Sequence, residues 1–367
     1  MTLPITQEKV DLAVDFITHY ADLCDGRPGW LSYHFGRWTP FGQCLLMALA
    51  DCEARVPQLG FRFIKELHEV KYVPSRIDES AWKARFEELI QKFSEILVAR
   101  AICLIEWPQG TKIEFEPLNK SNNKRPEFAV VTPEHTWLFE VKCPSFIAHQ
   151  HSRSANEHQL PIRSFMREAP ALQGETITLP RDNTLKDFLV SADGKFHGFA
   201  AGPVTGLLVV VWDASMYEAI GVLSHPQAGL LTPNSWFKKN GCVVTFPNVS
   251  GVIVLNRLEQ LKLGAQEHLD ELDPFELGGW DALPNTWCPN HDVGDLNPMI
   301  AKGFDAFHFE GTQIGADYSM MDYVLWLEAP HAIARRRARE RRQRASKLGL
   351  KCGVSSLTLT SCARSLN

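Results

Sequence analysis

The pattern of hydrophobic and polar positions along this chain first predicts helices. Segments 7–23 and 40–54 have helical spacing, with a Gly-, Pro- and aromatic-rich stretch between them. The clearest helix is expected over residues 80–103, where large apolar side chains recur at i, i+3 and i+4. They are Trp82, Phe86, Leu89, Ile90, Phe93, Ile96 and Leu97. This stripe predicts that one face of the helix lies against a core.

Strand patterns follow this helix. A first strand is expected at 112–118, and a hairpin is expected from two β-forming runs, 128–131 and 137–141, on either side of a Thr-Pro-Glu-His turn. Residues 206–212 read GLLVVVW, which predicts a strand buried on both faces of a sheet covered by helices. The other expected elements are helices at 183–196 and 215–223 and a strand at 249–255. The fold class is therefore α/β.

The remaining regions show little periodicity. Residues 143–181 contain several His and Arg residues without an apolar stripe, so we expect a loop or lid there. The predicted organisation is a helical N-terminal part (1–79), an α/β core (80–260), an irregular C-terminal elaboration (261–330), and a basic helix with a flexible tail (331–367).

Composition narrows the class of protein. Hydrophobic residues make up 45% of the chain and charged residues 22%, as in ordinary globular proteins. No apolar run approaches the roughly 18 to 20 residues of a membrane helix, and acids stand where a signal peptide has a basic start. The nine cysteines form no paired pattern, which favours reduced thiols. We therefore expect a cytoplasmic protein that does not contact a membrane.

Charge is distributed unevenly. Residues 335–347 hold eight basic residues and one acid, which is a local charge of +7. Because the net charge of the whole chain is −5, the rest of the chain carries −12. An acidic body argues against general coating of nucleic acid and leaves this segment as a candidate phosphate track. The alternatives are a solvated helix or tail and a surface for a protein partner.

The candidate chemistry lies in the hairpin. Pro126-Glu127 precedes its first strand, and Glu140-Val141-Lys142 closes its second. Because side chains alternate along a strand, Glu140 and Lys142 are expected on the same face. Converging carboxylates suit Mg²⁺, the Val141 carbonyl can complete the ligand set, and Lys142 can steer or deprotonate an attacking water. The bland alternative is a cross-strand surface ion pair.

The acid-x-Lys triplet alone is a weak signal. It recurs as Glu69-Val70-Lys71 and as Asp193-Gly194-Lys195. Only the copy at Glu140 follows a second strand-borne acid preceded by proline. The prediction therefore depends on the combination of the two motifs.

In this combination the sequence resembles the PD-(D/E)xK nuclease superfamily, over residues 80–213. Pro126-Glu127 matches its Pro-Asp element, and Glu140-Val141-Lys142 matches its Glu-x-Lys element. The resemblance implies the order helix, three strands, helix, strand, in a restriction-endonuclease-like core with a mixed central sheet flanked by helices. It also implies a supporting role for an acid on the first helix. Glu95 fits that role best, with Glu88 as the substitute, and Glu127 departs from the family by replacing an aspartate.

The resemblance implies a metal-dependent nuclease that uses Mg²⁺, with Mn²⁺ able to substitute, and DNA is the substrate that the family favours. Glu127, Glu140, Val141 and Glu95 would hold the metal, and Lys142 would position the nucleophile. Restriction, phage defence, repair and mobile-element proteins share this core. The alternatives are a non-catalytic nucleic-acid-binding or scaffold protein with the same fold, and an RNA-directed nuclease. A protein partner or a homo-oligomer stays open.

Other residues offer weaker sites. His149, His151 and His158, and the pair Cys288 and His291, have metal-binding side chains without a second pair at zinc-site spacing. Asp213 ends the apolar strand, at the carboxyl end where α/β sheets often bind ligands, although capping of the next helix by Asp213 or Ser215 is the favoured role. Lys186 and Lys195, on the helix expected at 183–196, can contact a substrate phosphate.

Overall fold

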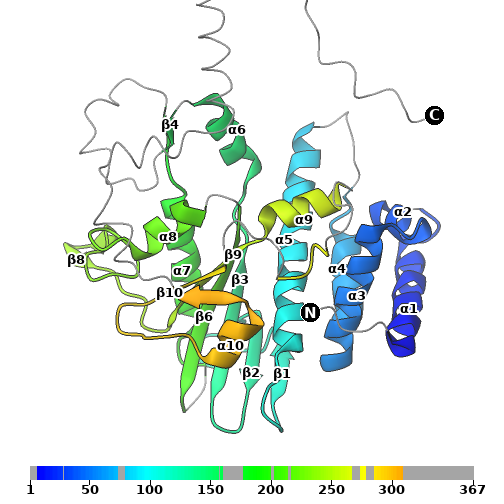
Figure 1. The fold of residues 1–367 in the computed structure, drawn as a ribbon, viewed down its shortest axis with the longest axis horizontal. Helices are drawn as coiled ribbons and strands as arrows, with labels where there is room; N and C mark the ends of the chain where they lie inside the picture. The colour runs from blue at the N-terminus through cyan, green and yellow to red at the C-terminus, as the bar shows by residue number, and fades with distance from the viewer. Residues whose placement is uncertain are drawn as a thin grey trace, which may run out of the picture.

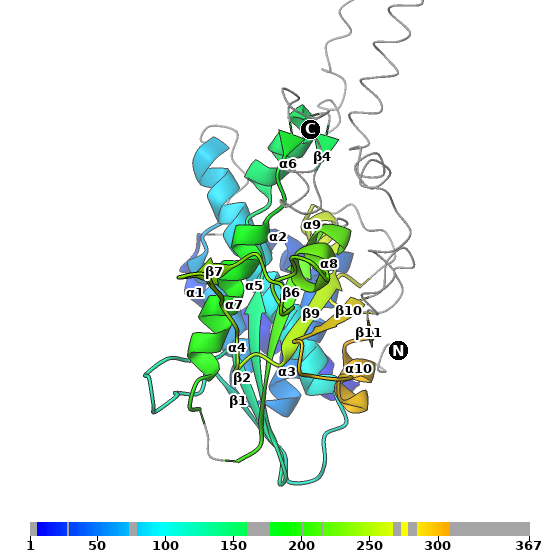
Figure 2. The same ribbon diagram turned by 90° about the vertical axis from the view of Figure 1, so that its left-hand side faces the viewer.

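A seven-stranded mixed sheet forms the centre of the structure, with helices on both faces (Figures 1 and 2). The computed structural model describes residues 6–27, 29–72, 79–156, 158–159, 177–199, 202–213, 216–266, 273–277 and 285–308. The strand order is β1-β2-β3-β6-β9-β10-β11. The expected α/β class with a mixed sheet flanked by helices is confirmed.

The sheet begins with an antiparallel meander and continues with parallel strands. The strands of the sheet are β1 (Lys112–Phe115), β2 (Phe128–Val131), β3 (Thr136–Lys142), β6 (Val204–Trp212), β9 (Gly251–Asn256), β10 (Asn285–Pro289) and β11 (Ala306–His308). β6 is parallel to β3 and β9 is parallel to β6, whereas β10 is antiparallel to β9 and parallel to β11. Two further strand pairs are short: β4 (His158–Gln159) with β5 (Ile177–Thr178), and β7 (Lys238–Lys239) with β8 (Cys242–Val243).

Helices cover the two faces unequally. One face carries α5 (Glu79–Leu104), and beyond it lie α1 (Gln7–Cys24), α2 (Trp30–Gly36), α3 (Pro40–Arg55) and α4 (Leu59–Glu69). The other face carries α7 (Asp182–Phe196) and α8 (Met216–Ser224). The remaining helices are α6 (Ile147–Ala155), α9 (Leu258–Ala265) and α10 (Pro298–Gly303). The sheet thus lies between a thick helical layer and a thin one.

Alternation along β3 separates two hydrophobic cores. Phe139 and Val141 belong to the core under α5, whereas Leu138 belongs to the core under α7. Because successive strand side chains point to opposite faces, Glu140 and Lys142 lie on the α7 face. The expected shared face of these two residues is confirmed by their ion pair.

Several sequence expectations need correction. The region 143–181, expected as a loop or lid, contains α6 and the short strands β4 and β5. Two helices were expected in segment 7–69, and the structure has four. The two additional helices are α2 and α4. No α6 side chain is buried, so this helix has no apolar stripe that periodicity could detect. The first strand ends at Phe115 instead of 118.

The region after residue 260 is more regular than its composition indicates. β10 and β11 extend the central sheet, and residue 260 itself lies inside α9. β10 escaped notice because two of its buried residues, Asn285 and Thr286, are polar. The Asn285 side chain is satisfied there by donating from Nδ2 to the Phe304 carbonyl, at 2.9 Å.

Residues 309–367, with the basic segment 335–347, lie outside the described residues. Within the described part of the chain, no helix is long and apolar enough to cross a membrane.

A buried ion network joins the thick helical layer to the C-terminal region. Arg100 on α5 donates from Nε to Asp51 Oδ2 on α3 at 2.9 Å, and from Nη1 to Asp273 Oδ2 at 2.6 Å and to the Phe275 carbonyl at 3.1 Å. Asp51 also pairs with Lys9 of α1 at 2.6 Å. One guanidinium therefore connects three segments that are far apart in the sequence.

We expect Arg100→Ala to lower the free energy of unfolding by about 3–5 kcal/mol, because Asp273 would lose its buried partner and Asp51 one of two. Arg85→Ala is the matched control. Arg85 pairs with Glu88 at the surface, so its loss should cost less than about 1 kcal/mol. Urea denaturation measures both variants, and equal losses would contradict the role of Arg100.

Candidate active site

Glu140 lies at the centre of the candidate site and is completely buried. β2 and β3 pair in a register that sets Phe128 opposite Phe139. Continuing this register by one residue sets Glu127 opposite Glu140. The Glu127 carbonyl accepts a hydrogen bond from the Glu116 amide at 2.8 Å, which continues the β1–β2 ladder past its last strand residue. The hairpin therefore holds the two carboxylates as cross-strand neighbours.

Two lysines neutralise Glu140. Lys142 Nζ lies 2.7 Å from Glu140 Oε1. Lys195 Nζ donates to both carboxylate oxygens of Glu140, at 2.6 and 2.8 Å, and lies 3.8 Å from Glu127 Oε1. The side chains of Lys142 and Lys195 are 26% and 22% exposed, so both ammonium-bearing chains reach solvent from a buried acid. The cluster therefore has a buried carboxylate and two lysines that extend from it toward solvent.

The connection between β1 and β2 fixes the end of α7 that carries Lys195. Asn119 is fully buried and donates from Nδ2 to the carbonyls of Lys195 and His197, each at 2.9 Å. Asn122 donates to the Gly194 carbonyl at 2.9 Å. The last carbonyls of a helix have no partner inside the helix, so these amides satisfy them. They also hold Lys195 over the β2–β3 pair.

Glu95 joins the site from α5. Lys92 Nζ lies 2.8 Å from Glu95 Oε2 and 3.1 Å from Glu66 Oε2 of α4. Burial raises the pKa of Glu95, and the positive charges of Lys92 and Lys142 offset part of this rise. A second acid and lysine pair thus lies within electrostatic range of the first.

Glu127 carries the largest pKa shift that is resolved in this cluster for an acid. Burial, followed by the negative charges of Glu95 and Glu140, raises its pKa to about 8, although Lys195 and Lys142 act in the opposite direction. The raised pKa favours the protonated form of Glu127 near neutral pH, while Glu140 is paired with two lysines. A site that confines acids in this way favours an added cation.

The structure brings together four residues predicted from the sequence: Glu95, Glu127, Glu140 and Lys142. The charges of Glu95, Glu140 and Lys142 act on the pKa of Glu127, and the charge of Lys142 acts on the pKa of Glu95. Val141 lies between Glu140 and Lys142 on β3, with its side chain buried in the α5 core. The substitute Glu88 is not part of the cluster, because it is exposed and pairs with Arg85 at 2.9 Å.

Sequence reasoning gave too little weight to Lys195. Its acid-x-Lys triplet was visible, but nothing in the sequence showed that the last turn of a helix would lie over β3. Lys92 and Glu66 gave no signal either, since charged residues on helices are usually solvated. The contact between Lys195 and Glu140 spans 55 residues and depends on the crossover from β3 to β6.

The histidine and cysteine candidates do not form metal sites in the described part of the chain, where no group of three or more His, Cys, Asp or Glu side chains is placed to hold a metal ion. His149 Nε2 lies 3.8 Å from Glu218 Oε1, and burial lowers the pKa of His149 to about 4. Cys288 is buried, and His291 pairs with Asp292 at 2.9 Å.

Asp213 and Lys186 have structural contacts. Asp213 binds Arg181 at 3.0 Å in a buried cluster with Glu218, where the Arg181 guanidinium also stacks on Trp212. Lys186 lies 3.1 Å from the exposed Asp187. The expected helix-capping role concerns residues 214–215 as well, which lie outside the described residues.

The raised pKa of Glu127 predicts a pH-dependent stability in metal-free buffer. Between the ordinary value of 4.5 and about 8, the folded state binds more protons at this group than the unfolded state, so the free energy of unfolding falls as pH rises. Glu127→Gln removes this penalty. Its stability relative to wild type should increase from pH 5 to 8, by up to about 1.4 kcal/mol per pH unit.

Urea denaturation in EDTA at each pH measures this difference. Glu88→Gln, at an exposed position, should follow the wild-type profile. If Glu127→Gln also follows it, the assigned protonation of Glu127 is wrong.

Comparison with protein-family models, with curated proteins and with solved structures found no match for this chain.

Proposed function

We propose that this protein is a metal-dependent nuclease of the PD-(D/E)xK type with a restriction-endonuclease-like core. One observation carries the proposal: Glu127 directly precedes β2 at the position that continues the β2–β3 register opposite Glu140, and Lys142 Nζ lies 2.7 Å from the Glu140 carboxylate. This is the arrangement that the paired motifs imply. A surface cross-strand ion pair would be solvated, whereas Glu140 has no exposed surface.

The order of elements supports the same proposal. α5 precedes the meander β1-β2-β3, and α7 then crosses over to β6, which is parallel to β3. Helix, three strands, helix and strand is the order that the resemblance implies. The additional α6, β4 and β5 lie between β3 and α7.

The donor atoms suit a divalent cation. Carboxylate oxygens are the ligands that Mg²⁺ prefers, and the Lys195 ammonium marks a point where a positive charge is shared by Glu140 and Glu127. Glu127 and Glu140 would hold the ion, with Glu95 as support. Among the described residues these acids do not form a ready group of three that could hold a metal ion, so a bound ion would have to displace the Lys195 ammonium from Glu140. A bound ion would neutralise phosphate charge and activate water. Mn²⁺ offers the same preference for oxygen ligands.

Lys142 is the residue that would position the attacking water. Its ammonium is fixed by Glu140 and its side chain is partly exposed, so it can orient a water at the rim of the site. Lys195 supplies a second positive charge beside it, for the phosphate of the substrate. DNA is proposed as the substrate on the resemblance, with RNA as the alternative.

We expect Lys142→Ala to reduce cleavage of plasmid DNA by about 100-fold or more, as for loss of a residue that handles the proton of a nucleophile. Glu140→Gln should abolish cleavage, because it removes a metal-binding charge and keeps the side-chain shape. Cleavage of plasmid and of RNA is measured with and without Mg²⁺.

Glu88→Ala and Lys186→Ala serve as controls for this assay, since both residues lie outside the cluster and pair elsewhere, Glu88 with Arg85 and Lys186 with Asp187. Both should cleave like wild type. If Lys142→Ala and Glu140→Gln both cleave as well as wild type, the nuclease assignment is wrong.

A second candidate function is a nucleic-acid-binding protein that keeps the nuclease fold without catalysis. The observation in its favour is Lys195, whose ammonium contacts both oxygens of Glu140 and so takes a cation-binding position. A permanent ammonium there would replace a metal ion. The two functions differ in whether a divalent cation can compete with this lysine.

Metal-dependent stability separates the two functions. For the nuclease, Mg²⁺ or Mn²⁺ should raise the melting temperature of wild type, and Glu140→Gln should not respond. Lys195→Met should respond at lower metal concentration, because it removes the competing charge. If no variant responds to metal while salt-sensitive DNA binding persists, the binding function is favoured.

A further inference from the structure

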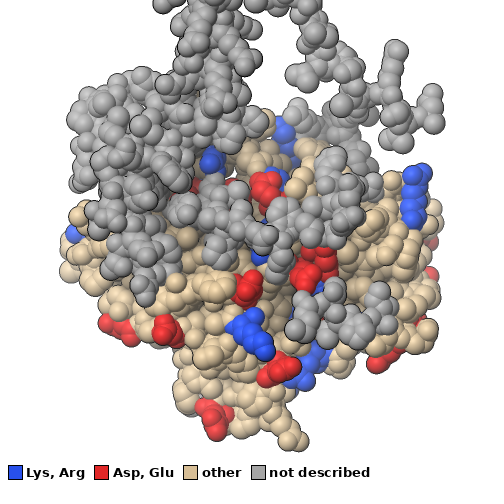
Figure 3. All heavy atoms as spheres, viewed as in Figure 1, with Lys and Arg blue, Asp and Glu red and all other residues tan. Residues whose placement is uncertain are grey.

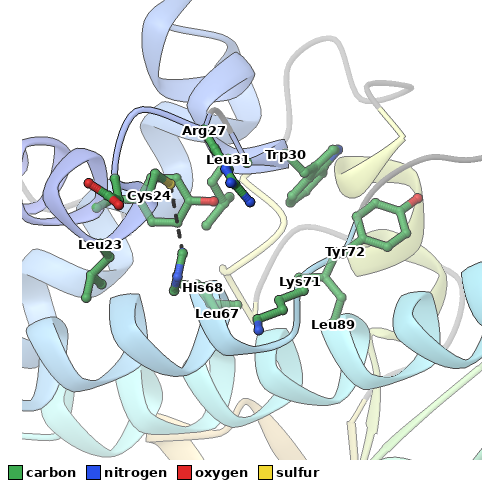
Figure 4. A pocket seen from close by; sticks show the side chains of 13 residues that line it. Leu23, Cys24, Arg27, Trp30, Leu31, Leu67, His68, Lys71, Tyr72 and Leu89 are labelled. Atoms are coloured by element: carbon green, nitrogen blue, oxygen red, sulfur yellow. Dashed lines mark hydrogen bonds between the residues drawn. The ribbon is translucent and has the colours of Figure 1, made fainter.

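The N-terminal helices line a partly open cavity of about 530 Å³ that is separate from the carboxylate cluster (Figure 4). Its walls come from α1, α2, α4 and α5 and from the segments that join them. This volume lies within the range of about 300–1,000 Å³ that is typical of small-molecule sites. None of its lining residues belongs to the proposed nuclease site.

One end of the cavity is aromatic. The rings of Trp30 and Tyr72 have centroids 5.4 Å apart and planes 82° to each other. The Tyr72 hydroxyl accepts a hydrogen bond from Trp82 Nε1 at 3.0 Å, which fixes the orientation of the tyrosine. Figure 4 shows both rings at the opposite end from Cys24 and His68. This end offers a rigid surface for a flat ring.

Two cations lie between the ends of the cavity. Figure 4 shows the Arg27 and Lys71 side chains directed into this middle part. Within the described residues neither side chain forms an ion pair, whereas Lys9, Arg62 and Lys92 on the neighbouring helices all pair with carboxylates.

The other end of the cavity combines polar side chains with apolar ones, since Leu23 and Leu67 lie beside Cys24 and His68 (Figure 4). Cys24 Sγ lies 3.8 Å from His68 Nδ1 and 4.0 Å from Ser32 Oγ. Asp25 also lines the cavity, so the acid and the two cations leave a net positive charge. A complete ligand therefore needs a flat ring, a strong negative charge beside it, and polar groups beyond.

We infer that this cavity binds a single nucleotide that carries a terminal phosphate. The base would lie against Trp30 and Tyr72, and the phosphate would contact Arg27 and Lys71. A phosphate monoester carries a charge of about −1.5 to −2 at neutral pH and several acceptor oxygens, which suit contacts with both Arg27 and Lys71. An inorganic anion would leave the aromatic end of the cavity unfilled.

The same chemistry has two sources: a free mononucleotide and the phosphorylated end of a strand. Isothermal titration calorimetry on the full chain distinguishes these two sources. The phosphorylated probes are four 5′-nucleoside monophosphates and a trinucleotide with a 5′-phosphate. The control probes are the matching nucleosides, inorganic phosphate and the trinucleotide without a 5′-phosphate. Monophosphates or the phosphorylated trinucleotide should bind at least tenfold more tightly than nucleosides, inorganic phosphate or the unphosphorylated trinucleotide. Tighter binding of the monophosphates would identify a free mononucleotide as the ligand, and tighter binding of the phosphorylated trinucleotide would identify the end of a strand.

Variants locate the binding. Arg27→Ala combined with Lys71→Ala should weaken binding at least tenfold, and Tyr72→Leu should weaken nucleotide more than inorganic phosphate. Lys65→Ala is the matched control, because Lys65 is an exposed lysine of α4 outside the cavity and should bind like wild type. Glu140→Gln should also bind like wild type, which separates this site from the nuclease site.

The inference is overturned by any of three results. The first is no binding of either phosphorylated probe at millimolar concentration. The second is equal affinity for phosphorylated and unphosphorylated probes. The third is unchanged binding in the Arg27 and Lys71 double variant while that variant remains folded by circular dichroism.

Discussion

The arrangement around β3 depends on one buried charge. Glu140 has no exposed surface, and an unpaired carboxylate in such a place would cost several kcal/mol. Lys142 and Lys195 remove that cost, and each does so from a different direction in the chain. One lysine is two residues away on the same strand, and the other requires that α7 be packed on the sheet. The carboxylate thus couples the hairpin to the crossover helix.

This coupling explains the polar connection between β1 and β2. Asn119 and Asn122 bind carbonyls at the end of α7, so a loop on one side of the meander positions a lysine that serves β3. On the opposite face, Lys92 connects Glu95 to Glu66 and extends the charge cluster into the helical layer. Polar groups from five elements or connections therefore surround a pair of strand residues. Such a network is costly if incomplete, so its satisfaction fixes the relative positions of these elements.

The sequence could predict those parts of the fold and site that rest on local patterns. Period-two alternation gave the shared face of Glu140 and Lys142, and a 3.6-residue stripe gave the core face of α5. Elements without an apolar signal were missed: α6 has no buried side chain, and β10 buries polar Asn285 and Thr286. Lys195 was undervalued because its role comes from tertiary packing.

The alternation along β3 has a consequence for strand register. Phe139 and Val141 lie in the core under α5, while Glu140 lies among the lysines on the opposite face. Sliding β3 by one residue against β2 and β6 would place Glu140 and Lys142 in the aromatic core and a phenylalanine against the Lys195 ammonium. The charge cluster therefore specifies a single alignment of the central strands. In this way it contributes to the uniqueness of the fold, whatever chemistry the cluster performs.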